Sequence, residues 1–306
     1  MNNLQKNIQN YMDYCRNQKR LDKKTLKAYQ IDLTQFQARI PCSEVQEISS
    51  DMLEAFIRNL HQQYKPKTVK RKIASVKALF HYFEYKDLID RNPFNKIQVR
   101  FREPAILPRT IPLHTIETLL SALYRQLEET HSCYQRKNVL RDIAVTEVLF
   151  ATGMRISELC SLKSHDVNLD DGNILIYGKG SKERHIQIEN KDVIDAMKTY
   201  HEAFAESIRK CGHFFATQNG RALSDQSVRR MLNKYTAIAS IDMHITPHMF
   251  RHTFATSLLE EDVDIRYIQE MLGHSSIHIT EIYTHVSTSK QRDILATKHP
   301  RKNFRL

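Results

Sequence analysis

Residues 246–259 read TPHMFRHTFATSLL, and this stretch predicts a helix with two chemically different faces. Thr246 suits the N-cap and Pro247 the first helical position. Apolar side chains recur at helical spacing on the face that should pack inward: Phe250, Phe254 and Leu258. His248 and Arg251 share the other face, because residues three apart are neighbours on a helix. Such a pair can hold one phosphate, the arginine through a bidentate fork and the histidine through a hydrogen bond or proton transfer.

A second arginine follows a glycine in the segment ATGMRISEL, residues 151–159. A tight turn at Gly153 places Arg155 at the start of a short helix. Apolar residues anchor that helix: Ile156, Leu159 and Leu162. We therefore expect Arg155 to be free to point into a cleft, and the alternative is an ordinary surface arginine.

A third helix is predicted near the C-terminus from apolar residues at helical spacing: Ile265, Ile268 and Leu272. It should end at Gly273, which suits the position after a helix C-cap, and His274 follows at once. Tyr283 comes nine residues after His274, within TEIYTHV. On general grounds a tyrosine at such a position is more often half-buried packing than a nucleophile.

Residues 174–188 predict a β-hairpin. Its two flanks, ILIY and RHIQI, alternate apolar with polar residues or carry β-branched ones, and the turn between them reads GKGSKE. Two glycines bracket Lys179, as hairpin turns favour. We expect Lys179 to project from the turn of a small sheet.

Residues 1–94 predict a helical N-terminal domain, because apolar residues recur at helical spacing and proline and glycine are almost absent. KPKT at 65–68 marks the start of a helix that runs to Tyr85. The polar face of this helix is predicted to carry five cations that can lie along a phosphate backbone: Lys67, Lys70, Arg71, Lys72 and Lys77. The proline-bearing residues 95–112 predict an extended linker, which leaves 113–306 as a second, mostly helical domain.

The charge of the chain is concentrated in its N-terminal third. The 306 residues carry a net charge of +11, and the first 100 hold 19 Lys+Arg against 10 Asp+Glu, or +9, leaving 27 against 25 for the rest. This excess favours an anionic partner such as nucleic acid. A merely solubilising basic surface and adhesion to a membrane surface are the alternatives.

The spacing of the cysteines and the distribution of the apolar residues indicate where in the cell the protein works. The five cysteines lie far apart without a C-x-x-C pair, which is typical neither of a disulfide framework nor of a zinc knuckle. The start, MNNLQKNIQN, lacks the apolar core of a secretion signal, and no stretch approaches the ~20 apolar residues that span a bilayer. We therefore expect a protein of the reducing cytoplasm that does not insert into a membrane.

Five motifs follow one another along the chain: TGMRISEL, the GKG turn, HMFRHTFAT, LGHSS and EIYTH. In order and spacing they resemble the tyrosine recombinase family, which covers phage integrases, Xer-type recombinases and Cre. KKTLKAYQIDLTQF and KPKTVKRKIASVKALFHYF are similar to the helical core-binding domain of that family. The resemblance implies a mainly α fold with a small antiparallel β-sheet in the C-terminal domain, and two domains that clamp DNA. The segment Tyr124 to Leu140 looks longer and more polar than the family's usual connection.

The resemblance also assigns six positions to an active site: Arg155, Lys179, His248, Arg251, His274 and Tyr283. It implies that Arg155 and Arg251 clamp the scissile phosphate, that Lys179 protonates the leaving 5′-oxygen and that Tyr283 is the nucleophile. The two histidines complete the cluster, and the first of them is the candidate base. No metal or other cofactor is implied, since the two arginines supply fixed positive charge.

By resemblance, the chain cleaves and rejoins duplex DNA at a specific site through a 3′-phosphotyrosyl intermediate, to move a mobile element or to resolve DNA dimers. The implied assembly is a homo-tetramer on two DNA sites, or a hetero-tetramer with a related recombinase, at the bacterial nucleoid. The alternatives are a type IB topoisomerase, a DNA-binding regulator and a zinc enzyme built on His248 and His252. The last lacks the glutamate of H-E-x-x-H, because Met249 takes its place.

Overall fold

The structure is a computed structural model that describes residues 3–99, 101, 109–178 and 183–273. The chain divides into two compact units, residues 1–105 and 106–306. Each unit has its own buried apolar cluster, as expected for separate hydrophobic cores. Within the described ranges, no helix combines the length and the apolar character that crossing a bilayer requires.

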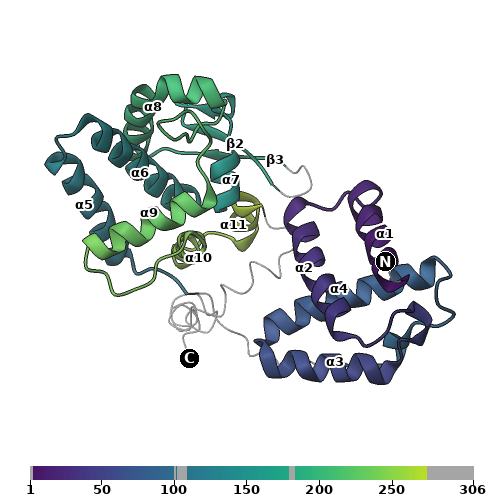
Figure 1. The fold of residues 1–306 in the computed structure, drawn as a ribbon. Coiled ribbons are helices and arrows are strands. Elements are labelled where there is room, and N and C mark those ends of the chain that lie inside the picture. The colour runs from purple at the N-terminus through teal and green to yellow at the C-terminus, as the bar shows by residue number, and fades with distance from the viewer. Residues whose placement is uncertain (1–2, 100, 102–108, 179–182, 274–306) are drawn as a thin grey trace, which may run out of the picture. The chain divides into compact units, whose positions relative to one another are not determined.

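The N-terminal unit is helical, as predicted (Figure 1). Its elements are α1 (Asn3–Asn17), α2 (Lys23–Arg39), η1 (Val45–Glu47), α3 (Ser50–Gln63), α4 (Pro66–Tyr85) and η2 (Pro93–Lys96). α4 begins and ends where the sequence predicts, with Pro66 in its first turn. The ring of Phe80 on α4 is fully buried and lies 6.0 Å from that of Phe36 and 5.5 Å from that of Phe94. The apolar face of α4 therefore forms the centre of this core.

Lys72, one of the five cations predicted to face a phosphate backbone, is buried instead, so this prediction is wrong. Lys72 is only 3% exposed, and its Nζ lies 3.0 Å from Oδ1 of the buried Asp32 on α2. The guanidinium of Arg71 and the hydroxyl of Ser75 also donate to Asp32. The reason is geometric: at 3.6 residues per turn, Lys72 lies about 140° round the helix from Lys67 and so faces α2.

The other predicted cations lie on the surface of α4. The exposed ones are Lys67, Lys70, Arg71 and Lys77, although Arg71 is also paired with Asp32. Lys67, Lys70 and Lys77 fall within an arc of about 80° on an ideal helix. They form what we call the α4 lysine face.

The C-terminal unit is built around one long central helix, α6 (Figure 1). Its elements are α5 (Leu113–Glu129), α6 (Cys133–Thr152), α7 (Ile156–Ser161), η3 (Ser164–Asp166), β1 (Val167–Asn168), β2 (Asn173–Tyr177), β3 (Glu183–Gln187), α8 (Lys191–Cys211), α9 (Asp225–Ile238), α10 (Pro247–Glu260) and α11 (Ile265–Leu272). α5, α8 and α10 pack against α6, and residues 142–149 of α6 are all buried. A helix that is covered on all sides is typical of a domain core.

The predicted hairpin is confirmed. β2 and β3 pair antiparallel, with Ile174 opposite Ile186 and Ile176 opposite Arg184, and β1 pairs with the other edge of β2. Alternate residues of β3 point into the unit, so that Arg184 and Ile186 are both buried.

The structure shows what the polar segment Tyr124 to Leu140 contacts. This segment belongs to α5 and α6 except for residues 130–132. The hydroxyl of Tyr124 donates to Oε1 of the buried Glu147 at 2.9 Å, and Nη1 of Arg136 donates to the Leu127 carbonyl at 2.9 Å. These polar side chains thus connect α5 with α6.

Asp32→Ala tests the buried ion cluster of the N-terminal unit. The change leaves Lys72 buried without a balancing charge, so the free energy of unfolding should fall by about 3–5 kcal/mol. Asp13→Ala is the matched control: the Asp13–Arg16 pair is exposed, and its loss should cost less than about 1 kcal/mol. Urea unfolding of the full chain, followed by circular dichroism, measures both. Similar small losses for the two variants would contradict this account.

Candidate active site

Arg251 is the most deeply buried of the predicted active-site residues that the structure describes, with 3% exposure. It lies on α10, whose predicted N-cap and first-turn proline are both confirmed. Its Nη1 donates to the Gly153 carbonyl at 3.0 Å and its Nη2 to the Leu272 carbonyl at 2.7 Å. The guanidinium therefore joins the α6–α7 turn to the end of α11. It stays charged, because arginine is not deprotonated in proteins.

Gly153 allows α10 and α11 to approach this turn closely. Its φ is +58°, in the left-handed region that favours glycine. A Cβ added there would lie 2.7 Å from Cδ1 of Phe254 and 3.1 Å from Cδ2 of Leu272. The predicted turn is thus confirmed. Because glycine has no side chain, Phe254 of α10 and Leu272 of α11 can pack directly against it.

Arg155 lies at the N-cap of α7, but it is not free as the sequence analysis expected. Its Nη1 is paired with Oε1 of Glu158 at 2.7 Å, and its backbone N–H donates to Oε2 of the same carboxylate at 2.9 Å. One third of the side chain remains exposed. Arg155 is therefore held in a fixed orientation at the surface of the site.

Sequence reasoning missed Glu158 and Arg184. Nη1 and Nη2 of Arg184 donate to the two oxygens of Glu158, at 3.2 Å and 2.7 Å, and Nε donates to the Met271 carbonyl at 2.8 Å. Burial raises the pKa of the Glu158 carboxyl, but the bonds from Arg184 and Arg155 outweigh burial and hold that pKa below its usual value. The alternating pattern of the predicted strand could have indicated this pair, because it places Arg184 at an inward position, and a buried arginine requires a buried partner.

The two histidines of α10 differ in environment. His248 is exposed on the first turn, whereas His252 is half-buried one turn later. Burial, together with the nearby charges of His248 and Arg251, lowers the pKa of His252 to about 4. His252 is therefore neutral at pH 7. Over the stretches that the structure covers, no group of three or more His, Cys, Asp or Glu side chains is placed to hold a metal ion.

α7, β3, α10 and α11 thus meet around three arginines, Arg155, Arg184 and Arg251. The structure brings the two predicted clamp arginines to the same turn, since Arg251 bonds Gly153 and Arg155 lies two residues further on. Lys179, His274 and Tyr283 lie outside the described residues, so their roles stay predictions.

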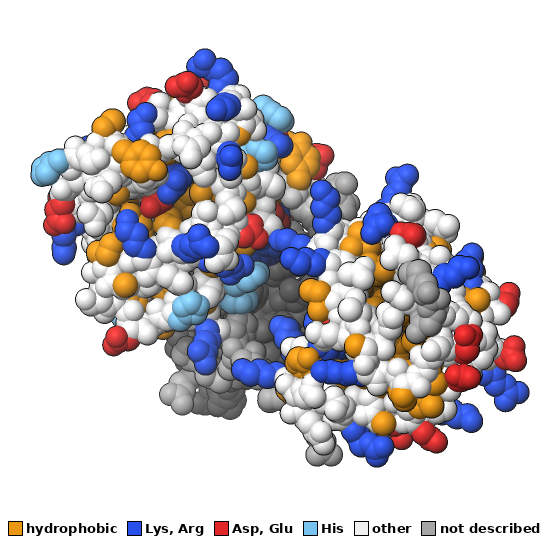
Figure 2. Space-filling view, in the orientation of Figure 1, with side chains coloured by type: hydrophobic (Ala, Val, Ile, Leu, Met, Phe, Trp, Pro, Cys, Tyr) orange, Lys and Arg blue, Asp and Glu red, His pale blue; other side chains and the backbone are white. Residues whose placement is uncertain are grey.

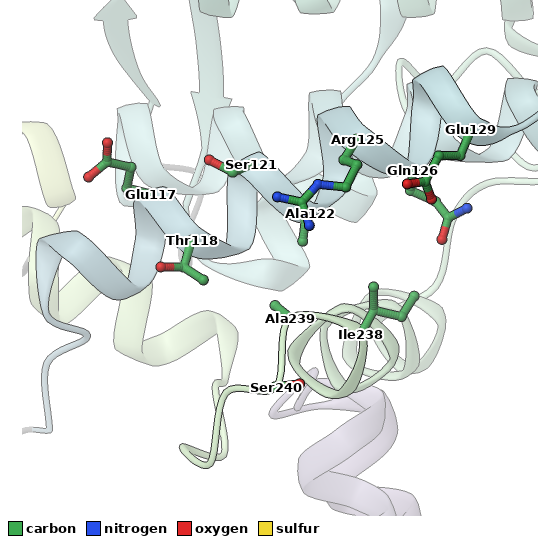
Figure 3. A pocket seen from close by; sticks show the side chains of 10 residues that line it. All are labelled: Glu117, Thr118, Ser121, Ala122, Arg125, Gln126, Glu129, Ile238, Ala239 and Ser240. Carbon is green, nitrogen blue, oxygen red and sulfur yellow. The ribbon is translucent and has the colours of Figure 1, made fainter.

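A cavity of about 490 Å³ lies elsewhere in this unit, between α5 and the end of α9. Figure 3 shows its lining, with Glu117, Arg125 and Glu129 on α5 and Ile238 on α9. None of the predicted site residues lines it. The cavity is therefore separate from the cluster of Arg155, Arg184 and Arg251.

Comparisons with known proteins agree with the motifs. Residues 113–290 match the phage integrase family, and residues 8–86 match the phage integrase N-terminal SAM-like domain. The chain is 63% identical to a tyrosine recombinase of Agathobacter rectalis, over 99% of both chains. It is 32% identical to the tyrosine recombinase XerD of Halalkalibacterium halodurans, over 98% of this chain and 100% of that protein.

The fold also has solved counterparts. The XerH site-specific recombinase, crystallised with a palindromic difH substrate as a post-cleavage complex, superimposes with a TM-score of 0.75. It is 22% identical to this chain, and the match covers 95% of this chain and 83% of that one. Together with the relatives named above, the family match shows that the chain belongs to the phage integrase family, as a Xer-like tyrosine recombinase.

Proposed function

We propose that this chain cuts and rejoins duplex DNA at a specific site through a covalent link between Tyr283 and a DNA 3′-phosphate. The arrangement of Arg155 and Arg251 supports this most directly: the partly exposed Arg155 follows the α6–α7 turn, and the buried Arg251 of α10 donates to Gly153 in the same turn. A positive site of this kind suits the doubly charged phosphorane-like transition state of phosphoryl transfer.

The reaction balances with the side chains of this chain alone. The phenol oxygen of Tyr283 forms a bond to phosphorus while the bond from phosphorus to the 5′-oxygen breaks. The phenol proton, whose pKa is ordinarily about 10, passes to His248, and Lys179 protonates the leaving oxygen. Arg155 and Arg251 neutralise the non-bridging oxygens, and the loss of one such donor typically costs about 10²–10³ in rate.

The covalent intermediate removes the need for an energy source such as ATP. A phosphotyrosine ester keeps the energy of the broken phosphodiester, so attack by a 5′-hydroxyl reseals the strand with release of Tyr283. When that hydroxyl comes from a second DNA site, the strands are exchanged. We propose a tetramer of this chain on two sites, or a mixed tetramer with a related recombinase, acting on the bacterial nucleoid.

We further propose that residues 1–94 form the core-binding domain, that residues 95–112 form a linker and that residues 113–306 form the catalytic domain with a tail for subunit exchange. The two domains would clamp duplex DNA. Lys and Arg side chains are spread over the face shown in Figure 2, with acidic side chains among them. In the N-terminal unit the α4 lysine face is an exposed cationic strip, which suits a phosphate backbone.

The first experiment locates the DNA site and tests the nucleophile. Duplex fragments tiled across the DNA that flanks the gene are incubated with purified protein, and fragments that carry covalently attached protein are sequenced. Sites at the ends of an element would indicate integration and excision, whereas a chromosomal site outside any element would indicate dimer resolution. Relaxation of supercoiled DNA of any sequence would instead favour a topoisomerase.

A nicked suicide duplex with the mapped sequence then compares Tyr283→Phe with the unaltered protein. The variant lacks only the attacking hydroxyl, so we expect unchanged DNA affinity and no detergent-resistant protein–DNA complex. Denaturing gel electrophoresis of labelled duplex measures the complex. A covalent complex that persists in Tyr283→Phe, or none with the unaltered protein, would contradict the proposal.

Neutralising the α4 lysine face tests the DNA-binding role of the N-terminal unit. For Lys67, Lys70 and Lys77 all changed to Gln, we expect weaker binding and a shallower dependence of log K on log salt, by about 0.9 for each phosphate that the protein no longer neutralises. Lys72→Met is the matched control, because Lys72 is buried and should leave the slope unchanged, while Arg71 still balances the charge of Asp32. Fluorescence anisotropy at several salt concentrations measures both slopes, and equal slopes would argue against this role.

A further inference from the structure

Arg184 is a buried cation that neither the motifs nor the proposed chemistry uses. It is 9% exposed, on β3, and it contacts α7 through Glu158 and the end of α11 through Met271. We propose that Arg184 is a positioning residue for cleavage: it fixes Arg155 through the shared carboxylate and fixes the end of α11 through the carbonyl. This inference rests on the proposed function.

Arg184 sets the orientation of the Glu158 carboxylate. It donates to both carboxylate oxygens, while the side chain and the backbone N–H of Arg155 donate to the same two oxygens. A planar guanidinium that binds both oxygens sets the plane of a carboxylate, which a lysine ammonium does not do. The orientation of Arg155 therefore depends on Arg184, although no bond between the two is needed.

The charge balance of this cluster also depends on Arg184. Glu158 is 7% exposed, and a buried carboxylate that is left with fewer partners becomes costly. The charged groups that face it in the described part of the chain are Arg155 from α7 and Arg184 from β3. Without Arg184, the carboxylate would be drawn to Arg155 alone, away from the position that both arginines now define.

The end of α11 is held by arginines as well. Nε of Arg184 bonds the Met271 carbonyl and Nη2 of Arg251 bonds the next one, that of Leu272. Cations at the last carbonyls of a helix are favourable. Gly273 follows with φ +63°, and a Cβ there would lie 3.0 Å from Nη1 of Arg184. Two arginines from different elements thus fix the point from which the chain continues to His274.

The test measures the single-turnover rate of covalent complex formation on the nicked suicide duplex, at saturating DNA. Arg184→Met should slow this rate by about 10–100-fold, because a displacement of about 1 Å of a catalytic group costs up to about 10² in rate. DNA affinity should stay within about twofold. The matched control is Arg141→Met, which removes another ion pair with low exposure, Arg141–Asp142 on α6, and should leave the rate within about twofold.

A double-variant comparison separates positioning from a merely structural role. If Arg184 acts through Glu158, then Glu158→Gln combined with Arg184→Met should be no slower than the slower single variant by more than about twofold. Independent structural damage predicts instead that the two losses multiply.

The pH profile gives a second independent readout. The Glu158 carboxylate must be charged to hold Arg155, so the rate falls when the pH drops through its pKa. The bonds from Arg184 oppose the effect of burial on that pKa. Arg184→Met should therefore raise the pKa of Glu158, so the ratio of the variant rate to the unaltered rate should fall further as the pH is lowered; the titration of His248 is common to both proteins and cancels in this ratio. Arg184→Lys keeps the charge, so its rate ratio should fall less at low pH while the reaction is still slowed. The Lys variant also replaces the Met variant in this test if the Met variant does not fold.

The outcomes are separable. If the unaltered protein forms the covalent complex and Arg184→Met forms it at the same rate, the positioning role is refuted and the proposed function stands. Multiplying losses, or a rate ratio that does not change with pH in both Arg184 variants, would equally refute it. If the unaltered protein forms no covalent complex, the proposed function fails and this inference fails with it.

Discussion

The proposed active site depends on one carboxylate, that of Glu158, which is shared between arginines of two different elements. A site for phosphoryl transfer must gather positive charges that repel one another before DNA is bound. Glu158 offsets this repulsion between Arg155 and Arg184, and the carbonyl oxygens of Gly153 and Leu272 hold Arg251 in place. The site is therefore preorganised by hydrogen bonds inside the C-terminal unit, so that little rearrangement is needed when the phosphate arrives.

The N-terminal unit uses the same physical solution for a different purpose. Asp32 is buried and accepts from Lys72, Arg71 and Ser75, which ties α2 to α4. The net charge of +9 over the first 100 residues already counts Lys72 and Asp32 as a cancelling pair, so the fold changes where the cations lie and not the net charge. Lys72 is buried, whereas the α4 lysine face and Arg71 are exposed at the surface of that helix.

Much of the fold follows from local patterns in the sequence. The bounds of α4, the start of α10, the end of α11 at Gly273 and the β2–β3 hairpin were all predictable, because spacing, prolines and glycines act over a few residues. The partners of buried charges were not. Glu158 and Arg184 are 26 residues apart and Lys72 and Asp32 are 40 apart, and no local pattern links them. Arg155 was predicted as a site residue, whereas the carboxylate to which it is bonded was not.

The central claim is that Tyr283 becomes joined to a DNA 3′-phosphate. The most direct measurement is mass spectrometry of the peptide that stays attached to DNA after the covalent complex is digested with protease and nuclease. The account predicts a nucleotide joined through its 3′-phosphate to the side chain of Tyr283. Attachment to any other residue, or through a 5′-phosphate, would contradict it.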